Sequence, residues 1–389
     1  MRKLACFPHK RARKGKTVRD SACFPHKQAR KGRRVSGEGI RHNEKRMKKG
    51  EFELIEWIKG QFVVPEGILG IGDDCAVLPQ DSGMETLVTT DMLVEGVHFL
   101  LEDIDPYSLG WKSAAVNLSD IAGMGGRPTG TFLSVALPEM GDTRTKKSFA
   151  HTDPADMDFR EEFTREFIMG YKDISDKFDC PLLGGDTTAS KDSLCINVTV
   201  LGSCEAGRSR KRSAAQPGDL VCVTGTLGDS GAGLKLVLER VGKGEQAETT
   251  RAVSEDNSAE EYLLERHYRP MPRVLEGLKL AETAGVNAMM DISDGIASDL
   301  RHILKESGTG ARVDVRSLPL SAELRAVCAR RGWDPVELAV GGGEDYELLF
   351  TCRPGTDIPV QHTVIGEILA APSLIWEGTD RDFTGFRHF

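Results

Sequence analysis

Apolar and polar positions in the first half of the chain follow the periods of helices and strands. Residues 84–91 and 130–138 are short, mostly apolar runs that predict strands. Between them, Asp105 and Pro106 are typical of a helix start, and the spacing predicts a long helix that ends at Gly125 and Gly126.

Further elements are predicted on both sides of this core. Phe52, Leu54, Ile55 and Ile58 are spaced as one apolar helix face, ended by Gly60. A helix is predicted over 160–178, and strands are predicted in CPLLGGD and LCINVTVLGSC, which follow it.

A second series of elements begins after a turn-rich, basic stretch at residues 207–219. DLVCVTGT predicts a strand. The helices that we then expect lie near 229–241, 272–285 and 294–307, and the strands lie near 288–292, 311–315, 346–352 and 362–368. Alternating elements of this kind predict an α/β (α+β) fold of two α/β domains with mixed sheets. We expect a first domain at 51–206 and a second at 207–389, with polar surface loops at 139–160 and 242–260.

Charge separates the first fifty residues from the rest. Residues 1–50 carry 18 Lys and Arg against 3 Asp and Glu, a balance of +15, whereas the remainder carries −23. Residues 5–15 and 22–32 form a tandem repeat with a 17-residue period that is too short to bury a core. We therefore expect a disordered basic extension before a natural beginning at Met47.

Three other interpretations of the extension stay open. Its Lys and Arg residues could bind nucleic acid weakly through phosphate, within residues 1–46. The two C-x-x-H pairs, made by Cys6, His9, Cys23 and His26, could hold zinc, although the spacing is not an established finger pattern. An Arg-rich, acid-poor start is also typical of a transit peptide.

Composition places the chain as a whole among ordinary globular proteins. Hydrophobic residues make up 39% and charged residues 28% of the chain, and no run approaches 18 apolar residues, so no membrane span is expected. The nine cysteines are scattered, without a C-x-x-C motif, which favours a reducing compartment. We expect a cytoplasmic protein.

Aspartates stand where apolar elements meet Gly, Ser or Thr. They are Asp73, Asp74, Asp91, Asp120, Asp186, Asp291 and Asp294. Any one of them could be a helix cap or a turn residue. Together with hydroxyls such as Thr89, Thr90 and Ser293, the set is typical of hard oxygen ligands for Mg²⁺, which is usually shared with substrate phosphates. The pattern indicates phosphoryl transfer in a cleft between the domains.

Motifs of other phosphate and hydrolase sites are missing from the sequence. There is no P-loop, no H-R-D with D-F-G, no H-E-x-x-H and no G-x-S-x-G. GTLGDSGAG at 225–233 is glycine-rich but lacks the dinucleotide-binding spacing. GGGEDYELLF at 341–350 predicts either a tight turn or a carboxylate, Glu344 or Asp345, that faces a substrate. Taken singly, His98 is more typical of a packed or exposed histidine than of a ligand, and Arg212 could either stabilise transferred phosphate charge or be a solvated charge.

The ordered set GIGDDCAVL, TTDMLVEGVHF, AVNLSDIAGMGG, LLGGDTT, DISDG and GGGEDYELLFT, with GFRHF at the end, resembles the thiamine-monophosphate kinases from about residue 51 onward. The resemblance implies transfer of the γ-phosphoryl group of ATP to thiamine monophosphate, giving thiamine diphosphate, with several Mg²⁺ ions as cofactors. It also implies a homodimer in which the strands of the first domain close a barrel.

The resemblance implies roles for particular residues. The metal candidates are Asp74, Thr89, Thr90, Asp91, Asp120, Asp186, Asp291 and Asp294, with Asp91 and Asp120 also taken as catalytic. The ATP contacts are Gly185, Asp186, Arg212 and Ser293. The contacts with thiamine monophosphate are His98, Glu344 and Phe383, whose ring is suited to stacking.

Two positions depart from the family pattern, and two alternatives stay open. Phe383 stands where many relatives carry Trp, and Ala214 replaces a glycine often found after the arginine. One alternative is another ATP-using member of the superfamily, such as a selenophosphate or aminoimidazole ribonucleotide synthetase. The other is a nucleic-acid-binding protein that acts through the basic extension.

Overall fold

The computed structural model describes Lys59 and residues 66–80, 82–138, 159–243 and 255–383. The predicted helix around residues 52–58, the basic extension and most of the predicted loop at 139–160 lie outside the described residues. Everything described belongs to one compact unit, Lys49–Phe389, which holds two α/β domains, each built on a mixed sheet. Among these residues, no helix has the length and apolarity needed to cross a bilayer.

The first domain is built on a five-stranded sheet in the order β1-β2-β5-β3-β4. Its strands are β1 (Ala76–Pro79), β2 (Met84–Val94), β3 (Arg127–Leu137), β4 (Leu182–Ala189) and β5 (Cys195–Glu205). All neighbours are antiparallel except β3 and β4, which are parallel. Alternate residues of β5, including Ile196, Val198 and Val200, are buried, whereas every residue of β4 is exposed. The sheet therefore has one covered face and an open edge.

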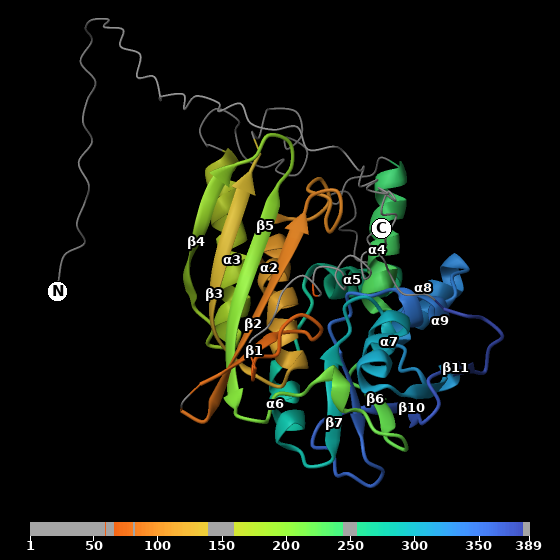
Figure 1. Ribbon diagram of the computed structural model, residues 1–389. Coiled ribbons are helices and arrows are strands. Elements are labelled where there is room, and N and C mark those ends of the chain that lie inside the picture. Colours follow the sequence, from red (N-terminus) through yellow and green to blue (C-terminus); the bar gives the residue numbers. More distant parts are fainter. Residues whose placement is uncertain (1–58, 60–65, 81, 139–158, 244–254, 384–389) are drawn as a thin grey trace, which may run out of the picture. The chain divides into compact units, whose positions relative to one another are not determined.

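Two helices cover one face of this sheet, α2 (Pro106–Gly123) and α3 (Phe159–Lys177). Figure 1 shows them side by side behind the strands. Asp105 caps α2 by accepting the backbone N–H of Ser108 at 2.8 Å, and Pro106 begins the helix, as predicted. The two helices approach closely because Gly110 and Gly170 lie at their contact, where an added Cβ would stand 1.9 Å from a backbone oxygen.

The second domain is built on a six-stranded sheet in the order β11-β8-β10-β6-β9-β7. These strands are β6 (Leu220–Val223), β7 (Val286–Asp291), β8 (Gly310–Asp314), β9 (Leu348–Cys352), β10 (Thr363–Leu369) and β11 (Leu374–Glu377). Only β11 and β8 are parallel to each other. All five residues of β9 are buried, consistent with its place in the interior of the sheet.

The helices of the second domain fall into two groups. Helix α7 (Ile296–Ser307) contacts β7 and β9, and α6 (Val274–Glu282) contacts α2. Helices α4 (Asp229–Lys243), α5 (Glu255–Tyr268), α8 (Ala322–Arg331) and α9 (Pro335–Gly341) form a second group around an apolar cluster that includes Leu236 and Leu263. Two short 3-10 turns, Arg212–Ala214 and Val315–Ser317, complete the fold.

Helix α2 is shared by the two domains. It contacts β2, β3 and β5 of the first sheet, and also β7 and β9 of the second. Sixteen of its residues are buried, although its apolar residues do not form a single stripe. A helix that is buried on nearly every side must be covered by protein all around. Because α2 contacts both sheets, residues of the two domains meet beside it.

The structure corrects the prediction for the polar stretch 242–260. Helix α5 begins at Glu255, inside that stretch, and its buried residues, Leu263 and His267, come only later. The first turns of α5 are polar, so the sequence there shows no apolar face that would predict a helix. Helices α8 and α9 lie within residues 322–341, where the sequence pattern predicted no element.

Candidate functional site

Four of the predicted aspartates lie where α2 meets both sheets. Asp74 precedes β1, Asp91 lies within β2, Asp120 lies near the end of α2, and Asp291 ends β7. Thr89 Oγ1 donates to Asp120 Oδ2 at 2.5 Å, and Ser119 Oγ donates to Asp291 Oδ2 at 2.6 Å. We call Asp74, Asp91, Asp120 and Asp291 the aspartate cluster. It joins residues from both domains.

Backbone geometry holds the aspartate cluster in place. Gly123, the last residue of α2, lies so close that an added Cβ would be 2.3 Å from Asp74 Oδ2 and 2.8 Å from the backbone nitrogen of Asp291. The same nitrogen donates to Asp74 Oδ2 at 3.3 Å. The backbone N–H of Asp91 donates to Asn117 on α2 at 2.9 Å. The glycine therefore sets the approach of α2 to β7.

The aspartates of the cluster raise one another's pKa. Burial is the largest cause for each: it raises the pKa of Asp74, and it raises the pKa of Asp120 well above its usual range. Burial and the charge of Asp74 raise the pKa of Asp291 to about 8. Buried carboxylates that repel one another are stabilised by a bound cation.

Arg212 is the cation that the structure places against Asp74. Its Nε donates to Asp74 Oδ1 at 2.9 Å, its Nη2 donates to the same oxygen, and its backbone N–H donates to Asp73 Oδ1 at 3.0 Å. The guanidinium thus partly neutralises the cluster from one side.

The donor set suits Mg²⁺, which prefers carboxylate and hydroxyl oxygens and usually takes one or two carboxylates from a protein. Within the described ranges, no three His, Cys, Asp or Glu side chains are arranged to hold a metal ion directly. The hydroxyl and arginine contacts described above instead hold the carboxylates separately. The residues therefore fit a shared, partly hydrated cation better than a closed protein cage.

A pocket of about 390 Å³ opens next to the aspartate cluster. Its polar lining includes Asp91, His98, Lys112, His267, Ser293, Asp294 and Glu344, and α4 adds the apolar side chains Leu234, Val237 and Leu238. His98 Nδ1 accepts the backbone N–H of Val94 at 3.0 Å. The pocket combines apolar walls with a few polar groups, as small-molecule sites do.

Glu344 stands on a strained segment at the wall of this pocket. Glu344 and Tyr346 have φ values of 55° and 50°, which side chains other than glycine seldom adopt. Two backbone bonds hold the segment: Glu344 N–H donates to Ser293 O at 2.7 Å, and Tyr346 N–H donates to Ile292 O at 2.9 Å. Backbone strain of this kind clusters at functional sites.

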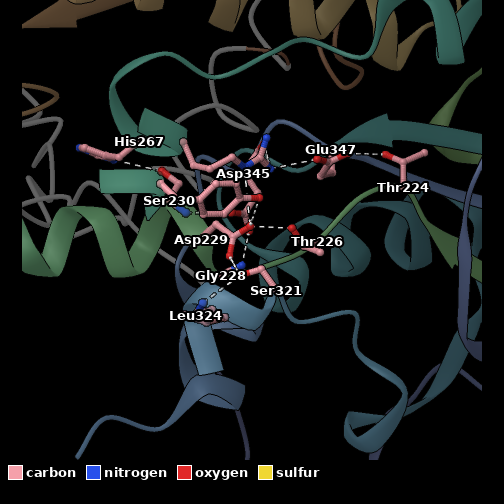
Figure 2. Close-up of polar contacts among 12 residues, drawn as sticks. Thr224, Thr226, Gly228, Asp229, Ser230, His267, Ser321, Leu324, Asp345 and Glu347 are labelled. Carbon is pink, nitrogen blue, oxygen red and sulfur yellow. Dashed lines mark hydrogen bonds and ion pairs between the residues drawn. The ribbon is translucent and has the colours of Figure 1, made fainter. Parts of the chain in front are cut away.

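The intervening Asp345 does not line the pocket, and its carboxylate belongs to a polar network instead (Figure 2). Its carboxylate accepts the backbone N–H groups of Gly228 at 2.7 Å and Ser230 at 3.1 Å, at the start of α4. Ser230 Oγ lies 3.0 Å from His267 Nδ1. Asp345 therefore fastens the strained segment to the N-terminus of a helix, where a carboxylate is favoured.

Glu347 anchors the other end of the same segment. Its buried carboxylate accepts hydrogen bonds from Thr224 at 2.7 Å and from Arg266 at 3.0 Å, and it forms a bidentate pair with Arg273. Bidentate arginine pairs are the strong form of charge-assisted hydrogen bond. The segment that carries Glu344 is thus fixed on both sides by buried charges.

Several predicted residues are not brought to the aspartate cluster. Thr90 faces the opposite side of the sheet from Thr89, and its Oγ1 donates to Val198 O at 3.0 Å, because neighbouring residues of a strand alternate between faces. Gly185 and Asp186 lie on β4, where the register Asp186–Ser134–Asn197–Met92 puts three strand spacings, on the order of 14 Å, between them and β2. They line a separate pocket of about 330 Å³ beside α3.

Phe383 is also placed elsewhere. Its ring is buried in the core of the second domain, edge-on to Trp376 with the centroids 5.3 Å apart. It lines a pocket of about 480 Å³ with Arg381, Asp382 and Gly341, and not the pocket of Glu344. The predicted role of Phe383 in stacking on substrate therefore stays a prediction.

The titratable pocket residues that sequence reasoning missed include Lys112 and His267. Lys112 Nζ lies 3.1 Å from Glu344 Oε2, and His267 Nδ1 lies 3.4 Å from the same oxygen. The one signal in the sequence is the position of Lys112, within a helix whose neighbouring residues are nearly all apolar or small.

Comparisons with known proteins agree with this geometry. The family described as AIR synthase related protein matches this chain with its N-terminal domain at residues 72–204 and with its C-terminal domain at residues 216–372. The thiamine-monophosphate kinase of Salmonella typhimurium is 39% identical over 335 residues, which cover 82% of this chain and 91% of the relative. That of Aquifex aeolicus is 35% identical over 346 residues, which cover 88% and 100%.

A solved structure described as AaThiL complexed with AMPPCP and TMP is also similar. It superposes with a TM-score of 0.74 at 34% identity, covering 87% of this chain and 97% of that one. With this extent of identity across both domains, the chain belongs to the thiamine-monophosphate kinase family.

Proposed function

We propose that this protein is a thiamine-phosphate kinase, which transfers the γ-phosphoryl group of ATP to the phosphate of thiamine monophosphate and releases thiamine diphosphate and ADP. The observation that carries the proposal is the adjacency of the aspartate cluster, of which Asp74 and Asp291 are buried, to the pocket that presents Glu344. The family relatives carry the name of this activity, and the similar solved structure is described with AMPPCP and TMP.

The reaction needs positioning and charge neutralisation more than it needs a protein nucleophile. An oxygen of the acceptor phosphate attacks the γ-phosphorus, and the bond from that phosphorus to the bridging oxygen of ADP breaks. Both substrates are polyanions, so their repulsion is the main barrier. Bound Mg²⁺ would supply electrostatic neutralisation of the phosphates.

The residues of this chain divide the remaining work. Asp74, Asp91, Asp120 and Asp291, with Thr89 and Asp294, would hold the metal ions. Arg212 and Ser293 would contact ATP, and His98 and Glu344 would contact thiamine monophosphate. The proposed mechanism does not depend on four predicted residues that lie outside the cluster and its pocket: Gly185, Asp186, Thr90 and Phe383.

The exposed face of the first sheet supports a homodimer in which the two sheets close a barrel. Phe132, Leu183 and Met92 are 40%, 56% and 55% exposed, and β4 is an open edge strand. Unpaired edges and apolar faces of this kind are commonly covered by a second chain. Leu183→Asp should therefore yield a monomer in sedimentation experiments, while Leu275→Asp, at another exposed leucine on α6, should not. A wild-type monomer at assay concentration would remove the dimer from the proposal.

The activity is tested by following thiamine diphosphate formation from thiamine monophosphate, ATP and Mg²⁺, with chains that begin at Met1 and at Met47 in parallel. We expect equal, magnesium-dependent product from both, in a protein that we place in the cytoplasm. No product from either folded chain would refute the proposed function.

A further inference from the structure

Lys112 combines three properties that an ordinary structural lysine lacks. Its side chain is 1% exposed, it lies in the middle of α2, and it lines the pocket beside the aspartate cluster. A buried ammonium loses its hydration, and burial of a charge costs free energy unless a partner compensates for it. Its partner is Glu344, 232 residues away in the sequence and in the other domain.

The pair gives Glu344 its charge state. Although burial alone would raise the pKa of Glu344, the charge of Lys112, with contributions from His267 and His98, holds this pKa below its ordinary value. His267 is itself neutral near pH 7, because burial and Lys112 lower its pKa to about 3. Of the two nitrogens within 3.4 Å of Glu344 Oε2, the ammonium of Lys112 is therefore the charged one at neutral pH.

An ionised carboxylate differs from a protonated one in what it can bind. It accepts hydrogen bonds only, and it attracts cationic or amino-bearing groups, whereas a protonated carboxyl group donates one bond and carries no charge. Glu344 is 27% exposed at the pocket wall, and its contacts with Lys112 and His267 are both made by Oε2. The strained backbone at Glu344 fixes the direction of the carboxylate, and Lys112 fixes its ionisation.

We propose that Lys112 is a positioning residue for thiamine monophosphate, because its ammonium holds the Glu344 carboxylate at the pocket wall in the acceptor form that the amino-bearing, cationic part of the substrate requires. This inference rests on the proposed function. It adds a residue of the first domain to a substrate contact made by the second, so substrate recognition depends on the junction of the two domains.

The test compares Lys112→Met with wild type and with Lys172→Met, an exposed lysine on the neighbouring helix α3. Thiamine monophosphate binding is measured by calorimetry without ATP, and KM values for both substrates are measured in the kinase assay. We expect Lys112→Met to weaken thiamine monophosphate binding and to raise its KM about tenfold or more, with the KM for ATP within twofold of wild type. Lys172→Met should resemble wild type.

A pH series separates this role from simple packing. The groups that face Glu344 are Lys112 from α2, His267 from α5, His98 from the segment after β2 and Tyr346 of its own segment. Without Lys112, Glu344 should be protonated more readily, so the KM of Lys112→Met for thiamine monophosphate should fall as pH rises from 7 to 9. That of wild type should stay level. A KM for the variant that does not change with pH would overturn the inference.

A double variant covers the case in which Lys112→Met fails to fold. Lys112→Met with Glu344→Gln removes both charges, so it should fold and should bind thiamine monophosphate as Glu344→Gln alone does. Weaker binding than Glu344→Gln would show that Lys112 acts independently of Glu344 and would overturn the inference. If Lys112→Met folds and binds thiamine monophosphate as wild type does, the inference about Lys112 is overturned, but the proposed function is not affected. Only absence of binding and turnover in wild type would remove the proposed function itself.

Discussion

Gly123 offers a direct test of how closely α2 must approach the site. In Gly123→Ala the added Cβ would stand 2.8 Å from the backbone nitrogen of Asp291 and 2.3 Å from Asp74 Oδ2. Gly123 is not in the left-handed region of backbone conformation, so space alone opposes the change. To reach ordinary contact at 3.4 Å, the nitrogen must retreat by about 0.6 Å and the carboxylate by about 1.1 Å.

These displacements set the expected magnitudes. Overpacking a well-packed interior costs about 1–3 kcal/mol, against which alanine regains part of the roughly 1 kcal/mol by which it exceeds glycine in a helix. We expect a net loss of about 1–2 kcal/mol in the free energy of unfolding and a melting temperature lower by a few degrees. Activity should suffer more, because misplacement of reacting groups by about 1 Å can cost about 10²-fold in rate.

The assay pairs thermal unfolding with turnover of thiamine monophosphate. The matched control is Gly242→Ala, since Gly242 lies on α4 with nothing within 4 Å of an added Cβ. It should keep wild-type turnover, with a small gain in stability at most. If Gly123→Ala kept both the melting temperature and the turnover of wild type, then α2 and β7 would not approach as closely as described, and the reasoning would be wrong.

Three further substitutions test other parts of the site. Asp120→Asn should cut turnover severely without lowering the melting temperature in metal-free buffer, because it removes one of several like charges; normal turnover would contradict a metal-binding role. The free energy of unfolding of His267→Gln should fall less on acidification than that of wild type. The folded protein keeps His267 neutral down to about pH 3, whereas the unfolded chain takes up a proton below about 6.5, so wild type loses stability as pH falls. Between pH 6.5 and 5, wild type should lose about 2 kcal/mol more of its free energy of unfolding than the variant does, as measured by denaturant titrations. An equal dependence on pH in the two proteins would refute this prediction. Glu347→Leu removes the buried carboxylate that Arg266 and Arg273 share, leaving Arg266 with the more distant Asp229 at 3.7 Å, and should cost about 3–5 kcal/mol in the same titrations. Arg316→Ala, in an exposed pair with Asp314, should change nothing measurable, and equal losses in both variants would contradict the difference in burial.

Elements with local signals were predictable from the sequence. The start of α2 was confirmed because Asp105 and Pro106 act on the next turn of the same chain. The members of the aspartate cluster were each singled out from the sequence because they stand beside Gly, Ser or Thr, and their role as metal ligands stays a prediction. The polar first turns of α5, in contrast, carry no apolar face that the sequence analysis could detect.

Contacts between residues that are far apart in the chain could not be predicted from the sequence. No local pattern joins Lys112 to Glu344, and the burial of Phe383 against Trp376 depends on how the chain returns to the core of the second domain. The separation of Thr90 from Thr89 was within reach, because it follows from the two-residue period of a strand that had been correctly assigned. The position of Asp186 required the strand order of the sheet, which the sequence does not reveal.

Helix α2 has a consequence for recombination between relatives. One face of this helix belongs to the core of the first sheet, while its far side contacts β7 and β9 and supplies Ser119 to Asp291. A chimera that joins the first half of one relative to the second half of another at residues 207–219 would therefore cut across an interface, although it cuts at a turn. Such chimeras should recover activity only when the residues of α2 that face the second sheet are exchanged together with that sheet.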